Sequence, residues 1–398
     1  MNLLYTVTAY PPSVGGAQTW FHQLACRLAR RHRLQVAAHW DRSRTDWLLG
    51  TTLRAPRHPA TYLLDGVPVH LLPLTRGQRL RIAPWVLSYY LTRGPAIEAI
   101  SDQILDHLEP LARDADLIHN GRVGREGLSF ASLKLARRLG VPFVLTPFHH
   151  PRWVGWNYRH YLRLYREADG VIALTQVEKE TLINLGVKPD RIFVTGMGPV
   201  LADSADADAF RQRYGLDGPV VLFVGQKYRY KGCAALLRAA PAVWARFPDT
   251  HFVFIGPRTR YSRLLFSRHR QPRVLELGIV DLQAKTDALA ACDLLCVPST
   301  QESFGGVFLE AWMLGKPVIG GNAPAAREVI ADGVDGYVVE QDPTAIAGQI
   351  VHLLDHPSLR DEMGQRGREK ALSRFTWERL AQLTEASYRA VLGQSRTV

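Results

Sequence analysis

Short apolar runs alternate along the chain with longer segments in which apolar and polar positions share a helical period. The short runs predict buried strands and the longer segments predict helices, an alternation that favours parallel sheets with crossover helices. In the first half the predicted strands are Leu3–Val7, Leu34–His39, Val67–Leu72, Leu117–His119, Pro142–Leu145, Val171–Leu174 and Arg191–Val194. In the second half they are Val220–Val224, His251–Ile255, Val274–Leu277, Leu294–Val297, Val318–Ile319 and Tyr337–Val339.

The segments between these strands predict two domains. Residues 196–208 are small and polar with few apolar positions, so they are predicted to link one domain to the next. A chain of 398 residues is long enough for two α/β cores of roughly 200 residues each. The predicted domains cover residues 1–196 and 197–375, and a last helix follows in 376–398. Residues 42–60 and 74–82 are predicted to be loops, the second of them basic.

The segment from Val297 to Gly321 carries the strongest functional pattern. A buried strand stops at Pro298, a polar loop with Glu302 follows, and a glycine pair opens a helix that contains Glu310. The helix is predicted to end at Gly315 and Pro317. Ligands bind at the carboxyl ends of parallel strands, and the free N–H groups of a helix start suit a phosphate. The pattern therefore predicts a ligand site rather than two solvated surface carboxylates.

A second glycine pair, Gly15-Gly16, lies between the first strand and the first helix. Backbone N–H groups there could hold a phosphate, although tight strand–helix turns also use glycine without a ligand. Neither the dinucleotide fingerprint G-x-G-x-x-G nor a P-loop occurs in the sequence.

Histidines follow two neighbouring strands of the first half. His149 and His150 follow the strand Pro142–Leu145, and adjacent residues on extended chain point in opposite directions, so at most one of the two is expected to face a cleft. His119 and Asn120 end the preceding strand and are candidates for the same cleft. A histidine here could contact a sugar hydroxyl, or it could be an ordinary surface residue.

Three cations follow the first strand of the second half, in the segment Gly225–Gly232. Lys227, Arg229 and Lys231 at the end of a strand could neutralise a diphosphate and stabilise it as a leaving group. A solvated basic turn is the alternative.

The spacing Glu302-x7-Glu310 with Phe304-Gly305 between them resembles the signature of retaining glycosyltransferases of family 4. The resemblance covers nearly the whole chain, densely from about residue 220 to 340. It implies the GT-B architecture, two facing Rossmann-like domains with an interdomain cleft, and a last helix that packs on the first domain.

The resemblance also implies roles for the candidate residues. Glu310 would bind the ribose and Glu302 the sugar hydroxyls, while Lys231 and the N–H groups of residues 303–306 would stabilise the leaving diphosphate. Catalytic roles are predicted for Glu302, His149 and Lys231. Donor-binding roles are predicted for Gly15, Gly16, Lys227, Arg229, Gly256, Ile279, Ser303, Phe304, Gly305, Gly306 and Glu310. Gln226 stands where the family has an arginine, and Lys227 or Arg229 could replace that cation.

The charge is uneven along the chain. Residues 1–198 carry 25 Lys and Arg against 15 Asp and Glu, whereas the net charge of the whole chain is +12. A basic first domain suggests an anionic surface such as a membrane or a phosphorylated acceptor, with a solvated basic surface as the alternative. The arginines at the end of the first helix (Arg27, Arg30, Arg31 and Arg33) and those in residues 76–81 are the candidates. No zinc-finger, basic-zipper or RNA-recognition signature occurs, so a nucleic-acid partner is not expected.

Together these features predict a retaining glycosyltransferase that moves a sugar from a nucleoside-diphosphate donor to a hydroxyl of a carbohydrate or lipid-linked acceptor. No metal or other cofactor is expected. Four cysteines are too few for a disulfide framework in a chain of this length, and no long apolar stretch occurs, so the protein is expected in the cytoplasm or at the inner face of the membrane. The alternatives are a nucleotide-sugar epimerase of the same fold and a non-catalytic sugar-binding subunit. The sequence does not identify the sugar, the base, the acceptor or the linkage.

Overall fold

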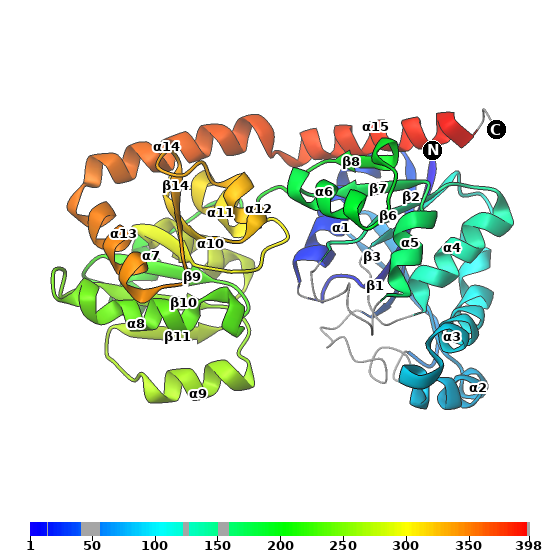
Figure 1. The fold of residues 1–398 in the computed structure, drawn as a ribbon, viewed down its shortest axis with the longest axis horizontal. Coiled ribbons are helices and arrows are strands. Elements are labelled where there is room, and N and C mark those ends of the chain that lie inside the picture. The colour runs from blue at the N-terminus through cyan, green and yellow to red at the C-terminus, as the bar shows by residue number, and fades with distance from the viewer. Residues whose placement is uncertain (14, 41–55, 122–126, 150–158, 396–398) are drawn as a thin grey trace. The chain divides into compact units, whose positions relative to one another are not determined.

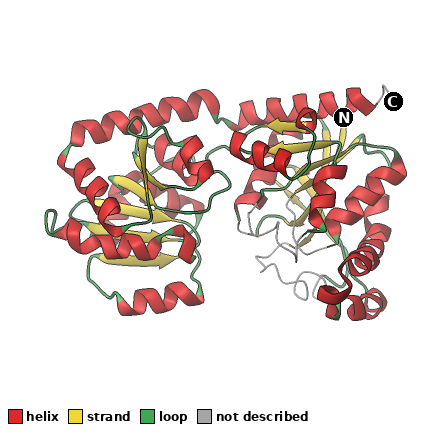
Figure 2. Cartoon of the chain, in the orientation of Figure 1, coloured by secondary structure: helices red, strands yellow, loops and turns green. Residues whose placement is uncertain are grey.

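The computed structural model describes residues 1–13, 15–40, 56–121, 127–149 and 159–395, and they form two compact units (Figure 1). Unit 1 comprises Met1–Gly196 and Trp377–Val398, and unit 2 comprises Met197–Thr376. Each unit contains one largely parallel sheet with helices packed against it (Figure 2). The prediction of two Rossmann-like α/β domains is confirmed.

The sheet of unit 1 has eight strands in the order β3-β4-β2-β1-β5-β6-β7-β8. Its strands are β1 (Asn2–Ala9), β2 (Arg33–Trp40), β3 (Ala60–Leu64), β4 (Val67–Leu71), β5 (Leu117–Gly121), β6 (Phe143–Thr146), β7 (Gly170–Ala173) and β8 (Ile192–Val194). Its helices are α1 (Gly16–Leu28), α2 (Arg76–Leu87), α3 (Tyr89–Ala112), α4 (Leu128–Leu139), α5 (Tyr161–Glu167), α6 (Gln176–Asn184) and α15 (Trp377–Ser395). Only β3 pairs antiparallel, in a hairpin with β4 whose turn is Asp65-Gly66.

Two local predictions for unit 1 were wrong. Residues 76–82 belong to α2, not to a loop, because Thr75 and Gln78 form a capping box and Ile82 and Val86 are buried. Strand β3 was not predicted, although an Asp-Gly pair between two alternating segments is a strong hairpin signal. Residues 42–55 of the other predicted loop, 42–60, lie outside the described residues.

The last helix, α15, packs against α1 within unit 1 (Figure 1). The hydroxyl of Tyr388 on α15 lies 2.7 Å from that of Tyr5 on β1, and both side chains are fully buried. Glu378 and Glu385 of the same helix pair with Arg27 (3.0 Å) and Arg31 (2.9 Å) near the end of α1. Arg27 and Arg31, two of the arginines predicted to face an anionic partner, are thus paired with carboxylates of the same unit.

The sheet of unit 2 has six parallel strands in the order β11-β10-β9-β12-β13-β14. These strands are β9 (Val220–Val224), β10 (His251–Ile255), β11 (Val274–Gly278), β12 (Leu294–Val297), β13 (Val318–Gly321) and β14 (Gly336–Val339). The helices are α7 (Ala207–Tyr214), α8 (Cys233–Trp244), α9 (Arg260–Arg268), α10 (Leu282–Ala291), α11 (Gly306–Met313), α12 (Pro324–Val329), α13 (Pro343–Asp355) and α14 (Pro357–Arg374). Each predicted strand of this half is present within one or two residues of its predicted bounds.

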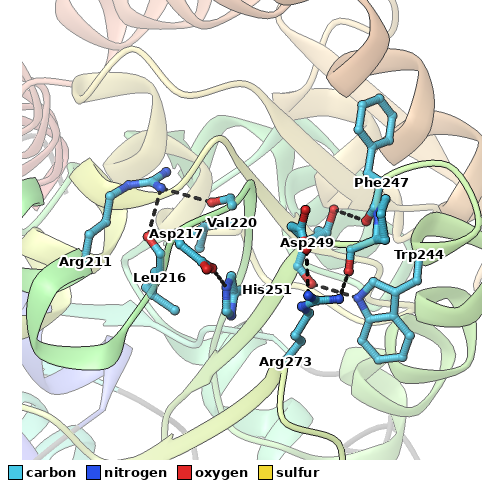
Figure 3. A network of polar contacts seen from close by, with 12 residues as sticks. Arg211, Leu216, Asp217, Val220, Trp244, Phe247, Asp249, His251 and Arg273 are labelled. Carbon is cyan, nitrogen blue, oxygen red and sulfur yellow. Dashed lines mark hydrogen bonds and ion pairs between the residues drawn. The ribbon is translucent and has the colours of Figure 1, made fainter.

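A polar network fixes the amino-terminal edge of this sheet (Figure 3). The Asp217 carboxylate lies 2.8 Å from Nε2 of His251, the first residue of β10, and Arg211 of α7 donates to the Gly218 carbonyl at 3.0 Å. Trp244 Nε1 donates to the Thr250 carbonyl at 2.8 Å. These contacts hold the starts of β9 and β10 in register, and the opposite, carboxyl-terminal edge carries the candidate site.

Candidate functional site

The order of strands in unit 2 places two loops side by side. Strand β9 lies between β10 and β12, so the chain reverses its direction of winding there, and ligands of open parallel sheets bind outside such a switch point. The turn after β9 carries Lys231 and the loop after β12 carries Glu302. Their Nζ and Oε1 atoms are 2.6 Å apart, and the two side chains are 19% and 8% exposed. The tertiary fold therefore joins two predicted site residues directly.

The helix that follows Glu302 presents its N-terminus at the same edge of the sheet. Gly305 has φ +93, a conformation that favours glycine, and a Cβ on Gly306 would lie 2.8 Å from the sulfur of Met197, whose side chain would have to shift. Phe304 is buried against Phe375, which anchors the loop. Within α11, all of which is described, the first turn carries no acidic side chain. The backbone N–H groups of residues 303–306 are thus placed for an anion.

Glu310 lies inside α11 and is a buried carboxylate. Its Oε1 is 2.8 Å from Nζ of Lys285 on α10, and the carboxylate also accepts a hydrogen bond from the backbone of Val200. Burial raises the pKa of Glu310, and the Lys285 ammonium opposes that rise. A buried acid that is paired and hydrogen-bonded is not an ordinary surface residue of a helix. The partner Lys285 was not predicted, because a single lysine on an amphipathic helix carries no sequence signal.

The three cations after β9 have different environments. Lys227 is fully buried, and its Nζ donates to the Gly256 carbonyl (2.6 Å) and to Glu276 Oε1 (2.7 Å). Burial lowers the pKa of Lys227, while the hydrogen bond that it donates to Glu276 raises it. Arg229 and Gln226 are exposed. Of the two cations considered as replacements for the missing arginine, the exposed one is Arg229, whereas Lys227 is held inside an ion pair.

Two further predicted residues lie at the ends of the neighbouring strands. Gly256 follows β10 with φ +129, and a Cβ there would lie 2.1 Å from the Gly225 carbonyl oxygen, so no other residue fits. Ile279 follows β11 and is 64% exposed. Both lie at the carboxyl-terminal edge of the sheet, at its β10–β11 side.

The remaining predicted residues belong to unit 1. Gly15 is the N-cap of α1 and Gly16 is its first residue, directly after β1 at the switch point between β1 and β5. A Cβ on Gly16 would meet no atom within 4 Å, so packing within the described structure does not require glycine there. This leaves room for a ligand to approach the helix start.

His119 and Asn120 lie inside β5, not at its end, and both are fully buried. The ring of His119 bonds Tyr388 through Nδ1 (2.6 Å) and Thr146 through Nε2 (2.8 Å), and burial lowers its pKa to about 3. Asn120 donates to the carbonyl of Thr6 at 2.9 Å. Both side chains thus stabilise the interior of unit 1.

His149 follows β6 and is largely buried, with Nδ1 3.2 Å from the Tyr165 hydroxyl. Its backbone N–H donates to the Glu178 carboxylate at 2.7 Å, and the other oxygen of that carboxylate accepts from the backbone N–H of Leu174. Phe148 before it has φ +47, a conformation that non-glycine residues rarely adopt. Hydrogen bonds to Glu178 and Tyr165 therefore fix the chain after β6. Glu178 was not among the predicted residues. His150 lies outside the described residues.

Family models of known proteins match parts of both units. The model of a glycosyl transferase 4-like domain matches residues 15–198, and that of glycosyl transferases group 1 matches residues 218–356. The chain carries the two domain families of a group 1 glycosyltransferase. This placement agrees with the resemblance drawn from Glu302 and Glu310.

Among curated relatives, the chain is 33% identical over 255 residues to D-inositol 3-phosphate glycosyltransferase of Acidothermus cellulolyticus, and the match spans 58% of this chain and 55% of that protein. It is 26% identical to the GDP-mannose-dependent alpha-(1-6)-phosphatidylinositol monomannoside mannosyltransferase of Mycolicibacterium smegmatis, across 96% and 97% of the two chains. Among solved structures, Anabaena HepE in complex with UDP and glucose superposes with a TM-score of 0.72 at 20% identity, covering 97% of this chain and 98% of that one. The structural likeness is one of fold.

Proposed function

We propose that the protein transfers a sugar, with retention of anomeric configuration, from a nucleoside-diphosphate donor to a hydroxyl acceptor. The observation that carries the proposal is the Lys231–Glu302 pair at the switch point of unit 2, beside the N-terminus of α11. An ammonium and a helix N-terminus are suited to a diphosphate, and a carboxylate is suited to sugar hydroxyls. The two domain families support this reading over the alternatives.

In the proposed reaction, the bond between the anomeric carbon and the diphosphate oxygen breaks while a bond to the acceptor oxygen forms. The acceptor proton passes to the leaving diphosphate on the same face of the sugar. Lys231 and the N–H groups of residues 303–306 stabilise the charge that develops on the diphosphate. We propose that these groups, together with the exposed Arg229, serve in place of a metal ion.

The nucleotide would be held by unit 2. Glu310 is buried beside Lys285, so its carboxylate keeps a fixed orientation and can accept hydrogen bonds from ribose hydroxyls. We propose that His149 of unit 1 contacts the donor sugar, because Tyr165 and Glu178 fix its ring and its backbone. Gly15 and Gly16 would lie close to the donor phosphates or the acceptor.

The relatives indicate which donors and acceptors should be tested. The smegmatis relative is described as GDP-mannose-dependent, and HepE was crystallised with UDP and glucose, so both bases need testing. Inositol phosphate and phosphatidylinositol derivatives occur in the names of the two curated relatives. We propose a polyol, glycoside or lipid-linked acceptor.

We also propose that unit 1 docks weakly on an anionic membrane surface on the cytoplasmic side. Several large apolar side chains are exposed on α2 and at the start of α3, namely Leu80, Trp85, Leu87, Tyr90 and Leu91. Exposed Arg76 and Arg81 lie on the same helix α2. Helix α2 is not amphipathic, so the proposal rests on these exposed apolar side chains and on the attraction of the arginines to anionic lipid. Among the described residues, no helix is long and apolar enough to cross a bilayer.

The test begins with a thermal-shift panel of nucleoside diphosphates and nucleotide sugars on the purified chain. A ligand present at 100 times its Kd stabilises the protein by roughly 2.7 kcal/mol, which is enough to rank donors. The best donor is then incubated with and without acceptors, and the products are identified with their anomeric configuration. Transfer with retention supports the proposal. Epimerised donor without an acceptor indicates the epimerase, and binding without turnover over a broad acceptor panel indicates a sugar-binding subunit.

A further inference from the structure

Three metal-ligating side chains meet in unit 1, and none of them is assigned to sugar transfer. His22 and Cys26 lie one helical turn apart on α1 and share a face, and Asp65 lies in the turn of the β3–β4 hairpin. One ligand atom from each residue falls within 4.8 Å of the other two. Nitrogen, sulfur and carboxylate oxygen are the donor set that Zn²⁺ takes in proteins.

One distance within this cluster, from the sulfur to the imidazole nitrogen, already matches a tetrahedral zinc site. Bonds of about 2.3 Å to sulfur and 2.0 Å to nitrogen place those two atoms about 3.5 Å apart around a tetrahedral ion. The Sγ atom of Cys26 lies 3.6 Å from Nε2 of His22. Nε2 lies 2.8 Å from Asp65 Oδ2, a hydrogen-bond distance that must widen by about half an ångström for a metal. Asp65 is exposed in its turn and can make that shift.

The surroundings of the cluster are also those of a ligand site. His22 is largely buried, and its Nδ1 lies 3.0 Å from the hydroxyl of buried Tyr10. If Nε2 binds a metal, Nδ1–H donates to Tyr10, which is the outer contact that orients a ligating histidine. Sγ of Cys26 is 3.7 Å from Nδ1 and 3.6 Å from Nε2, so the half-buried thiol must rotate toward Nε2.

The hairpin turn fixes the backbone of Asp65. This residue adopts φ +47, which is uncommon for any residue except glycine, asparagine and aspartate. The same hairpin is tied to the chain before α1 by a hydrogen bond of 2.6 Å from the Tyr62 hydroxyl to the Pro11 carbonyl. A metal bound here would add a second connection between the hairpin and α1, next to the glycine pair Gly15-Gly16.

We infer that His22, Cys26 and Asp65 form a binding site for a divalent transition-metal ion, with Zn²⁺ as the best fit, and that water completes the coordination. As the ion binds, the thiol proton is released to solvent, the ion replaces the proton between Nε2 of His22 and Asp65, and Nδ1 of the neutral ring carries the proton that it donates to Tyr10. Cys26 is a neutral thiol in the metal-free protein, since burial and the Asp65 carboxylate raise its pKa. Thiolate and carboxylate together neutralise the charge of the ion. The site is structural, because it ties the hairpin to α1 and does not use any residue assigned to the reaction.

The experiment uses the full chain, stripped with EDTA and kept reduced without thiol chelators. Zinc is titrated in competition with a chromogenic chelator, and Co²⁺ is then substituted to record its sulfur-to-metal charge-transfer band. We expect one ion per chain and a cobalt spectrum with that band. Cys26→Ser should abolish the band and weaken zinc binding at least tenfold. Tyr10→Phe should weaken it about tenfold, as loss of an outer-sphere partner does.

Asp65→Asn is the sharpest variant, because asparagine also tolerates a positive φ and keeps the turn. It should weaken zinc binding at least tenfold while circular dichroism and the melting temperature without metal stay unchanged. Asp114→Asn, which removes an exposed carboxylate elsewhere in unit 1, should bind zinc like the wild type. Substoichiometric zinc, a cobalt spectrum without the sulfur band, or equal affinity in Asp65→Asn and Asp114→Asn would overturn the inference.

Discussion

Lys231 and Glu302 lie 71 positions apart in the sequence, and their side chains form an ion pair with an Nζ–Oε1 distance of 2.6 Å. The pair holds the ammonium of Lys231 at the switch point of unit 2. A bound diphosphate would compete with Glu302 for this ammonium and leave the carboxylate available to sugar hydroxyls. Binding of the diphosphate and positioning of the sugar would therefore be coupled through the contact between Lys231 and Glu302.

Lys231→Ala should lower kcat/KM by about two orders of magnitude, because a cation that stabilises the leaving group acts mainly in the transition state. Steady-state kinetics with the donor identified by the thermal-shift panel measures this loss. Arg263→Ala, which removes an exposed cation from α9 of the same unit, is the matched control and should leave kcat/KM unchanged. Equal kinetics in the two variants would mean that Lys231 only pairs with Glu302.

Substitutions of the two glutamates of the β12–α11 segment should affect different quantities, nucleotide affinity in one case and kcat in the other. Glu310→Ala should weaken the binding of the free nucleoside diphosphate about tenfold to a hundredfold, since a hydrogen bond to a charged group contributes about 1.5–3 kcal/mol. Glu302→Gln should lower kcat strongly and change nucleotide affinity little. Calorimetry with the nucleotide and kinetics with the donor sugar distinguish the two effects. Unchanged affinity in Glu310→Ala, at an unchanged fold, would remove the ribose role.

Loss of Lys227 should lower the stability of the protein, whereas loss of Arg229 should lower its activity. Lys227→Ala removes the buried partner of Glu276, which keeps its pair with Arg258 (2.6 Å), so it should cost about 1–3 kcal/mol of unfolding free energy, measured by denaturant melts. Arg229→Ala removes an exposed cation and should leave stability unchanged while lowering kcat/KM about tenfold or more. If Arg229→Ala has wild-type kinetics, Arg229 does not replace the arginine absent at Gln226.

Docking on a membrane should depend on α2. Each Arg near an anionic surface contributes about 1 kcal/mol, and the attraction decays over roughly 8 Å at physiological salt, so binding should be weak and reversed by salt. Leu80→Ser with Leu87→Ser should reduce co-sedimentation with anionic vesicles at low salt. Leu63→Ser, an equally exposed leucine on β3, is the control. If anionic vesicles retain no more wild-type protein than neutral ones, the basic half of the chain is only a solvated surface.

Unit 1 should lose stability in mild acid because of two buried histidines. Burial lowers the pKa of His119 to about 3 and that of His39 to about 4, whereas both titrate near 6.5 when unfolded. The unfolded chain therefore binds protons that the folded chain does not. Their contribution to stability is complete above pH 6.5 and falls by about 1.4 kcal/mol per pH unit per histidine between pH 6.5 and about 4.

Thermal melts from pH 7.5 to 4.5 measure this slope. His119→Gln should melt at a lower temperature at neutral pH, because it loses its contacts to Tyr388 and Thr146, but with a shallower dependence on pH. His58→Gln, at an exposed position, should keep the wild-type slope. A slope that is the same in all three proteins would show that His119 is not the source.

The sequence by itself determined the features that depend on neighbouring residues. The strand runs, the α/β alternation and the junction from β12 to α11 were predictable, because strand apolarity, glycine pairs and a Gly-Pro helix end act within a few positions. The placement of Glu302 and Glu310 on either side of that junction followed from the same local signals. The capping box of α2 and the Asp-Gly turn before β4 were also local signals, and they were overlooked.

Only the tertiary structure decided which of several similar residues has which environment. Lys227 and Lys231 lie four positions apart in one basic turn, yet the first is buried against Glu276 and the second meets Glu302. His119 lies in a central strand and is covered by Tyr388 from a helix near the end of the chain. Asp65 is brought to His22 and Cys26 by a hairpin turn. Burial and charge partners depend on the order of strands and the packing of helices, and both join residues that are far apart in the sequence.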